Sequence, residues 1–206
     1  DLHSFPTRRS SDLAILAILL TIAVLCGRGG SSLPDDNENE TEFSLINYLE
    51  THDVQSYEEF ETIISSVSPE DANEIDSDSV KDFSISIDYD NQIVSVTTVD
   101  EALIRGNGVG DTASRSYYSD IGKKIFTISL TADFTYYTGH CSTTSASGSY
   151  TRAYLSTWTS TPTISSGNYS ASVAYARISG TATSGSSSIN YSLTMTCDDT
   201  GDINVY

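Results

Sequence analysis

The chain has 206 residues and a formal net charge of −18, with 28 acidic residues against 10 Lys and Arg. Residues 31–101 contain twenty acidic residues and a single lysine, whereas residues 102–206 contain six acidic and six basic residues. Because affinity for nucleic acid depends on Lys and Arg neutralising phosphates, this balance disfavours a nucleic-acid partner. This excess of acidic residues is typical of the solvent-exposed face of a helix. The alternative interpretation is that it binds a cationic partner.

The first thirty residues differ in character from the rest of the chain. Residues 1–13, DLHSFPTRRSSDL, correspond to one reading frame of a common sequencing adaptor, so we expect them to be an artefact. The apolar run that follows suits a signal peptide in length, whereas a membrane span needs about 20 residues. We therefore expect residues 14–30 to be a signal peptide or a truncated membrane anchor. Cys26 leaves lipid attachment as an alternative, although Leu25 is larger than the residue usual before a lipidated cysteine.

A short acidic helical segment is expected before the main domain. Residues 31–42, SSLPDDNENETE, are polar and acidic and predict a linker. Residues 43–80 predict the helical segment, in which Ser56 and Glu59 match a capping box. Phe43, Ile46 and Leu49 at three-residue spacing favour a short, marginal helix before it, and another short helix is expected from Pro69 through Ile75. The apolar residues that recur at helical spacing after Ser56 are Phe60, Ile63, Ile64 and Val67.

From residue 81 the apolar pattern changes to a period of two, which is typical of strands. Residues 83–89 and 92–99 flank Asp90-Asn91 and predict a hairpin, and residues 106–114, GNGVGDTAS, predict a flexible loop. Short strands at this spacing predict a mainly β protein, with an antiparallel β-sandwich, immunoglobulin-like or similar, over residues 81–206. The other predicted strands cover residues 125–137, 150–158, 168–178 and 188–197.

Cys141 and Cys197 are the cysteines of the region expected to be exported. Two cysteines in a protein of an oxidising compartment favour one disulfide between them. The last predicted strand places Cys197 on an apolar face, so we expect the bond to cross between two sheets. A nucleophilic Cys141 beside His140 is the weaker interpretation, because adjacent strand residues point to opposite faces.

Four stretches carry a resemblance to known proteins: FTYYTGHC, YLSTW, SGNYSASVAYARI and SINYSLTMTCDDTGDI. Together they resemble a group of small exported β-domain proteins of Gram-positive, Clostridia-like bacteria, which have an acidic helical segment before the β part. The similarity covers residues 43–203. It implies a secreted or cell-surface location and this architecture, and it implies no activity and no site residues.

The sequence contains no recognisable catalytic motif. His52 and His140 are the candidate bases, but neither sits in a G-x-S-x-G, H-E-x-x-H or phosphate-loop context. The stretches DYDN and DDTGD lack the spacing of calcium loops and predict turns. We therefore expect no catalytic, metal or cofactor residues. A secreted carboxylate-dependent hydrolase of the glycosidase type remains the alternative, because it could use any of the acidic residues.

Binding or display is the function that the sequence favours most. Trp158, Tyr154 and Tyr150 are candidates for stacking on sugar rings, although alternating aromatic residues more often pack within a sheet. The hypothesis is a non-catalytic exported or cell-surface β-sandwich protein with a polysaccharide or protein partner. A membrane contact is expected only through the N-terminal segment, if that segment is not cleaved.

Overall fold

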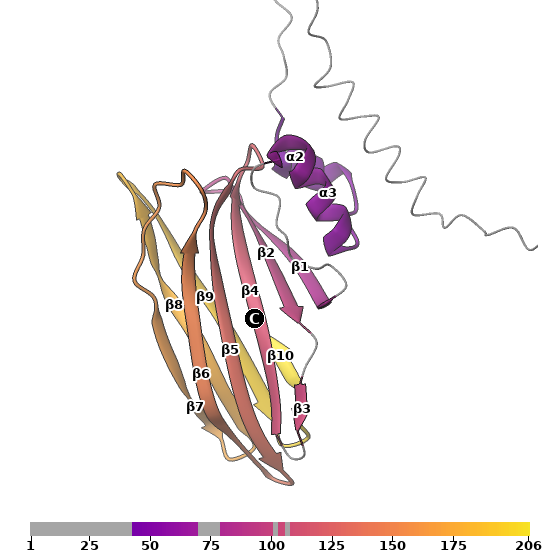
Figure 1. Ribbon diagram of the computed structural model, residues 1–206, viewed down its shortest axis with the longest axis vertical. Helices are drawn as coiled ribbons and strands as arrows, with labels where there is room; N and C mark the ends of the chain where they lie inside the picture. The colour runs from indigo at the N-terminus through magenta and orange to yellow at the C-terminus, as the bar shows by residue number, and fades with distance from the viewer. Residues whose placement is uncertain (1–42, 70–78, 101–102, 106–107) are drawn as a thin grey trace, which may run out of the picture.

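The computed structural model describes residues 43–69, 79–100, 103–105 and 108–206 (Figure 1). The expected adaptor, signal peptide or anchor, Cys26 and linker lie outside these residues, as does most of the helix expected after Pro69. Within the described ranges, no helix combines the length and the apolar composition needed to cross a membrane.

Two short helices precede the strands, as expected. Helix α2 covers Leu45–Thr51 and helix α3 covers Tyr57–Val67. The Ser56 hydroxyl accepts the Glu59 N–H at 3.1 Å, which confirms the expected N-cap. The Glu59 carboxylate accepts the N–H of Gln55 at 3.0 Å, so the return half of the capping box is displaced by one residue.

The described residues from Val80 onward form two antiparallel sheets, which confirms the predicted mainly β, sandwich-like fold. Sheet A has the order β1-β2-β4-β5-β6, with β3 paired to β4, and sheet B has the order β10-β9-β8-β7. The strands of sheet A are β1 (Val80–Asp88), β2 (Ile93–Asp100), β3 (Leu103–Arg105), β4 (Gly108–Ser119), β5 (Lys124–Tyr137) and β6 (His140–Arg152). Those of sheet B are β7 (Thr163–Ser170), β8 (Val173–Ser184), β9 (Ser187–Asp198) and β10 (Ile203–Val205).

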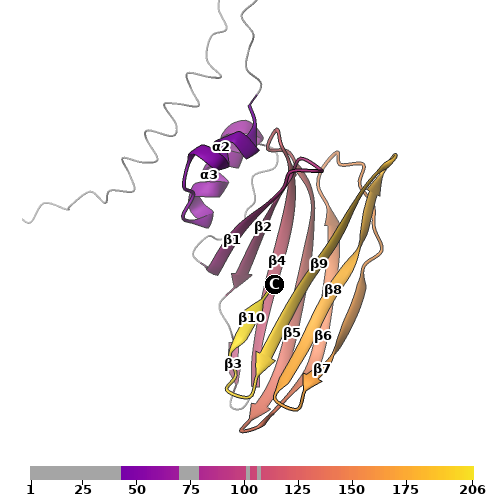
Figure 2. The same ribbon diagram turned by 180° about the vertical axis from the view of Figure 1, so that it is seen from behind.

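The strand order in each sheet follows the chain, so both sheets are meanders. This connectivity differs from the Greek-key connections of immunoglobulin domains. Seen from either side, the two sheets lie face to face and the two helices lie beside one end of β1 and β2 (Figures 1 and 2). Sheet B therefore lies on the side of sheet A away from the helices.

Three of the predicted strand boundaries were wrong. The expected loop 106–114 lies mostly in β4, where a Cβ on Gly110 would come within 2.3 Å of an oxygen of Asp133, so this glycine permits close packing. Strand β6 begins at His140, directly after a turn at Gly139 with φ 76°, and not near residue 150. The single strand expected over 168–178 instead contains the end of β7, the turn and the first half of β8.

The main core lies between the sheets and follows the predicted alternation. The last long strand was predicted to place its apolar residues on one face, and this is confirmed because all of them are buried. Tyr117 and Phe126 face each other across β4 and β5, with ring centroids 4.4 Å apart. The buried residues of that strand, β9, are Ile189, Tyr191, Leu193, Met195 and Cys197.

A second core lies between the helices and the outer face of sheet A. Phe60 of α3 is fully buried there against Tyr118 and Phe83, with ring centroids 5.3 and 6.3 Å away. The carboxylate of Asp120, in the turn between β4 and β5, accepts hydrogen bonds from the Ser44 hydroxyl and the Ile46 N–H, both at 2.9 Å. The start of α2 is therefore attached directly to this turn.

Cys141 and Cys197 are free thiols, so the predicted disulfide is wrong for this structure. The expected cross-sheet placement is present: both residues are fully buried in the main core, and their side chains share a hydrogen bond. The structure therefore has the cross-sheet contact that the prediction needs, but with a hydrogen bond between two thiols in place of the covalent bond.

We expect both thiols to resist alkylation in the native protein. Burial raises the pKa of Cys197, and the thiolate is the form that reacts. Peptide mapping should find Cys141 and Cys197 unmodified after alkylation of the native chain, and both alkylated after denaturation without a reductant. Modification only after reduction would show instead that the two cysteines are bonded.

Candidate functional site

A cavity of about 520 Å³ lies where three connections meet at one end of the sandwich. It is lined by the β1–β2 turn at Gln92, the β4–β5 turn from Asp120 to Lys124, and the β6–β7 connection from Leu155 to Trp158. We call this cavity the loop-end pocket. Its volume falls within the range of about 300–1,000 Å³ that is typical of small-molecule sites.

Trp158 is a fixed wall of the loop-end pocket. Its ring is half-buried and packs against the main core. The next residue, Thr159, exchanges two backbone hydrogen bonds of 2.9 and 3.0 Å with Thr183 of β8. This pairing holds the connection against sheet B, so the position of the indole is set before any ligand arrives.

The backbone of the loop-end pocket is locally strained. Within the described residues, the non-glycine residues with positive φ are Gln92 at 54° and Leu155 at 60°, and both line this pocket. The left-handed region is costly for residues that have a Cβ, and such strain gathers at binding and active sites. Leu155 is also 70% exposed, so its side chain is accessible from solvent.

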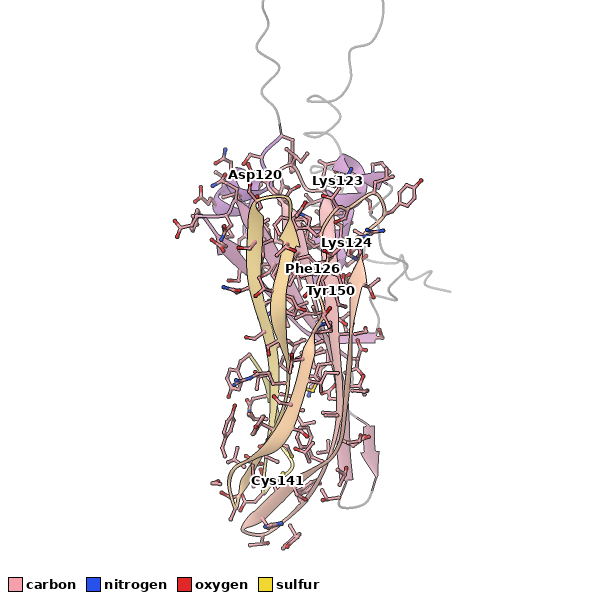
Figure 3. All side chains as sticks on the ribbon, turned by 90° about the vertical axis from the view of Figure 1, so that its left-hand side faces the viewer. Asp120, Lys123, Lys124, Phe126, Cys141 and Tyr150 are labelled. Carbon is pink, nitrogen blue, oxygen red and sulfur yellow. The ribbon has the colours of Figure 1, made fainter. Side chains whose placement is uncertain are left out.

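Two lysines add positive charge to the loop-end pocket. Lys123 and Lys124 are half-buried in its lining, and the Nζ of Lys124 lies 5.9 Å from the centre of the Tyr118 ring. Asp120, Lys123 and Lys124 lie together at one end of the sandwich, while Cys141 lies toward the other end (Figure 3). The Asp120 carboxylate already accepts two hydrogen bonds from the start of α2.

The three aromatic candidates from the sequence are not brought together. Tyr154 is 73% exposed beside the loop-end pocket but does not line it. Tyr150 lies opposite Ile128 on the inner face of sheet A and packs 5.1 Å from Phe126 between ring centroids. Its hydroxyl is buried with no hydrogen-bond partner in the described part of the chain, and burial raises its pKa. Its ring packs against the main core and does not line the loop-end pocket, so this geometry gives no support to a stacking role for Tyr150.

The histidines and the DDTGD turn lie apart from the loop-end pocket, whereas Asn91 of the DYDN turn lines it. His52 stacks on Tyr48 with ring centroids 4.1 Å apart, and His140 lies 4.8 Å from Tyr137. The Asp198 carboxylate accepts hydrogen bonds from the Thr200 hydroxyl and from backbone N–H groups of its own turn, which lowers its pKa. Among the residues that the structure describes, no group of three or more His, Cys, Asp or Glu could hold a metal ion.

Sequence analysis missed one buried acid, Asp111, which lies in a second, smaller cavity. This edge pocket, of about 270 Å³, lies between the inner face of sheet A and β10 and is also lined by Lys81 and Asp82. Asp111 is only 6% exposed, and burial raises its pKa to about 6. Its carboxylate accepts the Thr112 N–H at 2.8 Å. The residue escaped notice because the surrounding glycines suggested a loop.

Asp111 does not form a catalytic pair with Asp133, although the two lie on neighbouring strands. Asp133 is opposite Gly110 in the register and Asp111 is opposite Ala132, so the two carboxylates point to opposite faces of sheet A. Asp133 instead accepts a hydrogen bond of 2.6 Å from the Ser145 hydroxyl. Asp82 is the carboxylate that shares the edge pocket with Asp111.

The chain was compared with protein-family models, with curated proteins and with solved structures. None of them matched it. The interpretation of the two cavities therefore depends on their own geometry and chemistry, and the resemblance noted for the sequence adds no site residue to either of them.

Proposed function

We propose that the protein is a non-catalytic, exported or cell-surface binding protein and that it binds a saccharide in the loop-end pocket. The observation that carries this proposal is the placement of Trp158 in a concave site between rigid connections. An indole face offers a large apolar surface that can stack on the apolar face of a sugar ring. Strained residues at Gln92 and Leu155 support a site whose shape is selected for binding.

The chemistry of the loop-end pocket supports binding better than hydrolysis. A glycosidase normally needs two carboxyl groups that flank the scissile bond. In the described lining of this pocket, Asp120 is the only carboxylate, and its hydrogen bonds to Ser44 and Ile46 fix it to α2. An acid and base pair for bond cleavage is therefore not present beside Trp158.

The direct test follows the emission of Trp158, the single tryptophan of the chain, during titration with cell-wall, mucin and plant polysaccharides. We expect a saturable change with one class of polymer. Trp158→Ala should weaken retention of the chain on that polymer by about tenfold or more in affinity electrophoresis, because the stacking surface is lost. Tyr154→Ala is the matched control, since that exposed ring lies outside the pocket lining. No saturable change with any polymer, in folded protein, would contradict the proposal.

One observation favours a second candidate function, a carboxylate-dependent hydrolase. The raised pKa of Asp111 would let it donate a proton near neutral pH, with Asp82 in the same edge pocket as the second carboxylate. The same polysaccharide panel tests this alternative if new reducing ends are measured after incubation. Their release by the wild-type chain, and its loss in Asp111→Asn, would support the hydrolase.

A further inference from the structure

We infer that the edge pocket binds a primary ammonium group at the end of an unbranched alkyl stem, with Asp111 as its counter-ion. This pocket is separate from the loop-end pocket, so the inference does not depend on the proposed saccharide site. The observation that carries it is a buried carboxylate that lines a cavity and forms no ion pair within the described part of the chain.

The carboxylate and the apolar walls of the edge pocket lie on the same side of sheet A. Asp111 is directly opposite Ala132 in the register, and paired residues of neighbouring strands point to the same face. Ala132 and Val99 belong to the main core, and Ile203 and Val205 of β10 pack against that core from sheet B. These side chains therefore enclose one space between the two sheets, beside the edge strand β10 (Figure 2).

Asp111 carries a buried charge that is only partly compensated. Its Oδ1 accepts the Thr112 N–H at 2.8 Å, whereas its Oδ2 receives no hydrogen bond from any residue that the structure describes. A buried aspartate is almost always paired, because an ion without a partner loses its hydration. With a pKa of about 6 this carboxylate is still mostly ionised at neutral pH. A ligand cation at Oδ2 would recover part of that lost hydration energy.

The two neighbouring cations do not occupy this position. Lys81 lines the pocket and lowers the pKa of Asp111, but it is an exposed residue and forms no ion pair with that carboxylate. Arg115 lies four residues further along β4, on the same face. It donates instead to the Thr97 hydroxyl from Nε and to the Ser192 carbonyl from Nη1, both at 2.7 Å.

The other charged groups near Asp111 are negative and favour a cation. Asp82, which lines the same pocket, and Asp100 at the end of β2 both raise the pKa of Asp111. Strand β10, which closes the pocket from sheet B, consists of Ile203, Asn204 and Val205 and contributes no titratable side chain. The field inside the pocket is therefore set by three carboxylates against one exposed lysine.

The shape of the site favours an alkylammonium over a guanidinium. An arginine fork pairs best with both oxygens of a carboxylate, but Oδ1 of Asp111 is already bonded to Thr112. An ammonium is a point charge, and one oxygen suffices for it. Val99, Ile203 and Val205 offer apolar surface for the carbon stem, as apolar surfaces do for lysine stems elsewhere. The cavity of about 270 Å³ suits one such group.

The test titrates Nα-acetyl-lysine methylamide into ¹⁵N-labelled protein and follows the Thr112 N–H resonance, because this N–H donates to Asp111. We expect a saturable shift, and at least about tenfold weaker binding of the same compound acetylated at Nε, which has lost its charge. Nα-acetyl-arginine methylamide should also bind more weakly. n-Butylammonium identifies the source of the amine: it binds more tightly than the lysine compound if the natural ligand is a free amine, and less tightly if it is a protein side chain.

The affinity should depend on pH in one direction. The ammonium has to displace the proton from Asp111, while the amine itself stays charged, since its pKa is about 10.4. We therefore expect binding at about pH 5 to be about tenfold weaker than at about pH 7.5, with a plateau above the pKa of Asp111. By the same linkage, saturating amine should lower the pKa of Asp111.

Three variants locate the site. Asp111→Asn should weaken binding by about tenfold or more and remove the pH dependence. Asp133→Asn is the matched control, because it removes the same charge from the exposed face of the sheet and should leave the affinity unchanged. Lys81→Gln should tighten binding, since the ligand then no longer shares the pocket with a second positive charge.

The inference is overturned if the Thr112 resonance shows no saturable shift at about pH 7.5, where Asp111 is ionised. Equal binding of the charged and the Nε-acetylated compound would also overturn it, as would undiminished binding by Asp111→Asn. None of these outcomes bears on the polysaccharide titration of Trp158, which tests a different pocket.

Discussion

Replacing Phe60 by alanine is expected to lower the free energy of unfolding by about 3 to 5 kcal/mol, the range measured for large-to-small changes in protein cores. Phe60 is fully buried between α3 and sheet A, where its ring meets Tyr118 and Phe83. The substitution removes one of the fully buried side chains that join the helices to the sheet. Urea denaturation, followed by circular dichroism, measures the change.

Tyr137→Ala is the matched control for Phe60→Ala, because it removes an aromatic ring that is 60% exposed on β5. It should change the stability by less than about 1 kcal/mol. If Phe60→Ala were equally mild, the helices would contribute little to the stability of the sandwich, and the second core described above would not be an integral part of the fold.

Replacing Asp111 by asparagine should stabilise the protein near neutral pH. Burial raises the pKa of Asp111 to about 6, from about 3.9 for a free aspartate, so ionising it opposes folding. Lys81 offsets part of this effect, whereas Asp82 and Asp100 add to it. The asparagine keeps an oxygen that can accept the Thr112 N–H and carries no charge at any pH.

The sign of the pH effect follows from proton linkage. The folded protein binds this proton more tightly than the unfolded chain, so the contribution of Asp111 to stability is fully present below about pH 4. It is lost as the pH rises to about 6. We therefore expect Asp111→Asn to gain about 2 to 3 kcal/mol over the wild type at pH 7 and almost nothing at pH 4.

Chemical denaturation of the wild type and Asp111→Asn at several pH values between 4 and 7 measures this difference. Asp133→Asn is the matched control, because it removes one negative charge from the exposed face of the same sheet. A constant offset between the Asp111→Asn and wild-type curves would argue against the buried ionisation as the cause.

The elements that could be predicted are those in which one face is buried and the other is exposed to solvent. Residues 125–137 and 188–197 alternate apolar and polar side chains, and both are strands close to the predicted bounds. The cap at Ser56 was predictable because it is a local interaction between residues three apart. These patterns depend only on neighbouring residues, so the sequence displays them directly.

The elements that were missed depend on contacts between distant parts of the chain. Gly110 suggested a loop because its role, making room for Asp133, involves a residue on another strand. The β7–β8 hairpin was hidden because β7 is exposed along most of its length and so lacks an apolar alternation. For the same reason Trp158 was named from the sequence, but its proximity to Lys123 was not, since only the fold brings the two turns together.

The meander order of both sheets has a consequence for how the chain assembles. Nearly every strand pairs with its neighbour along the chain, across turns of a few residues, so closing each pair costs little chain entropy. The strands of sheet A can pair one after another along the chain before the strands of sheet B have formed. Docking of the two finished sheets then remains as the main long-range step, and the late partner of that step is the C-terminal part of the chain, residues 163–205. Local pairing of this kind favours faster folding than the interleaved connections of a Greek key.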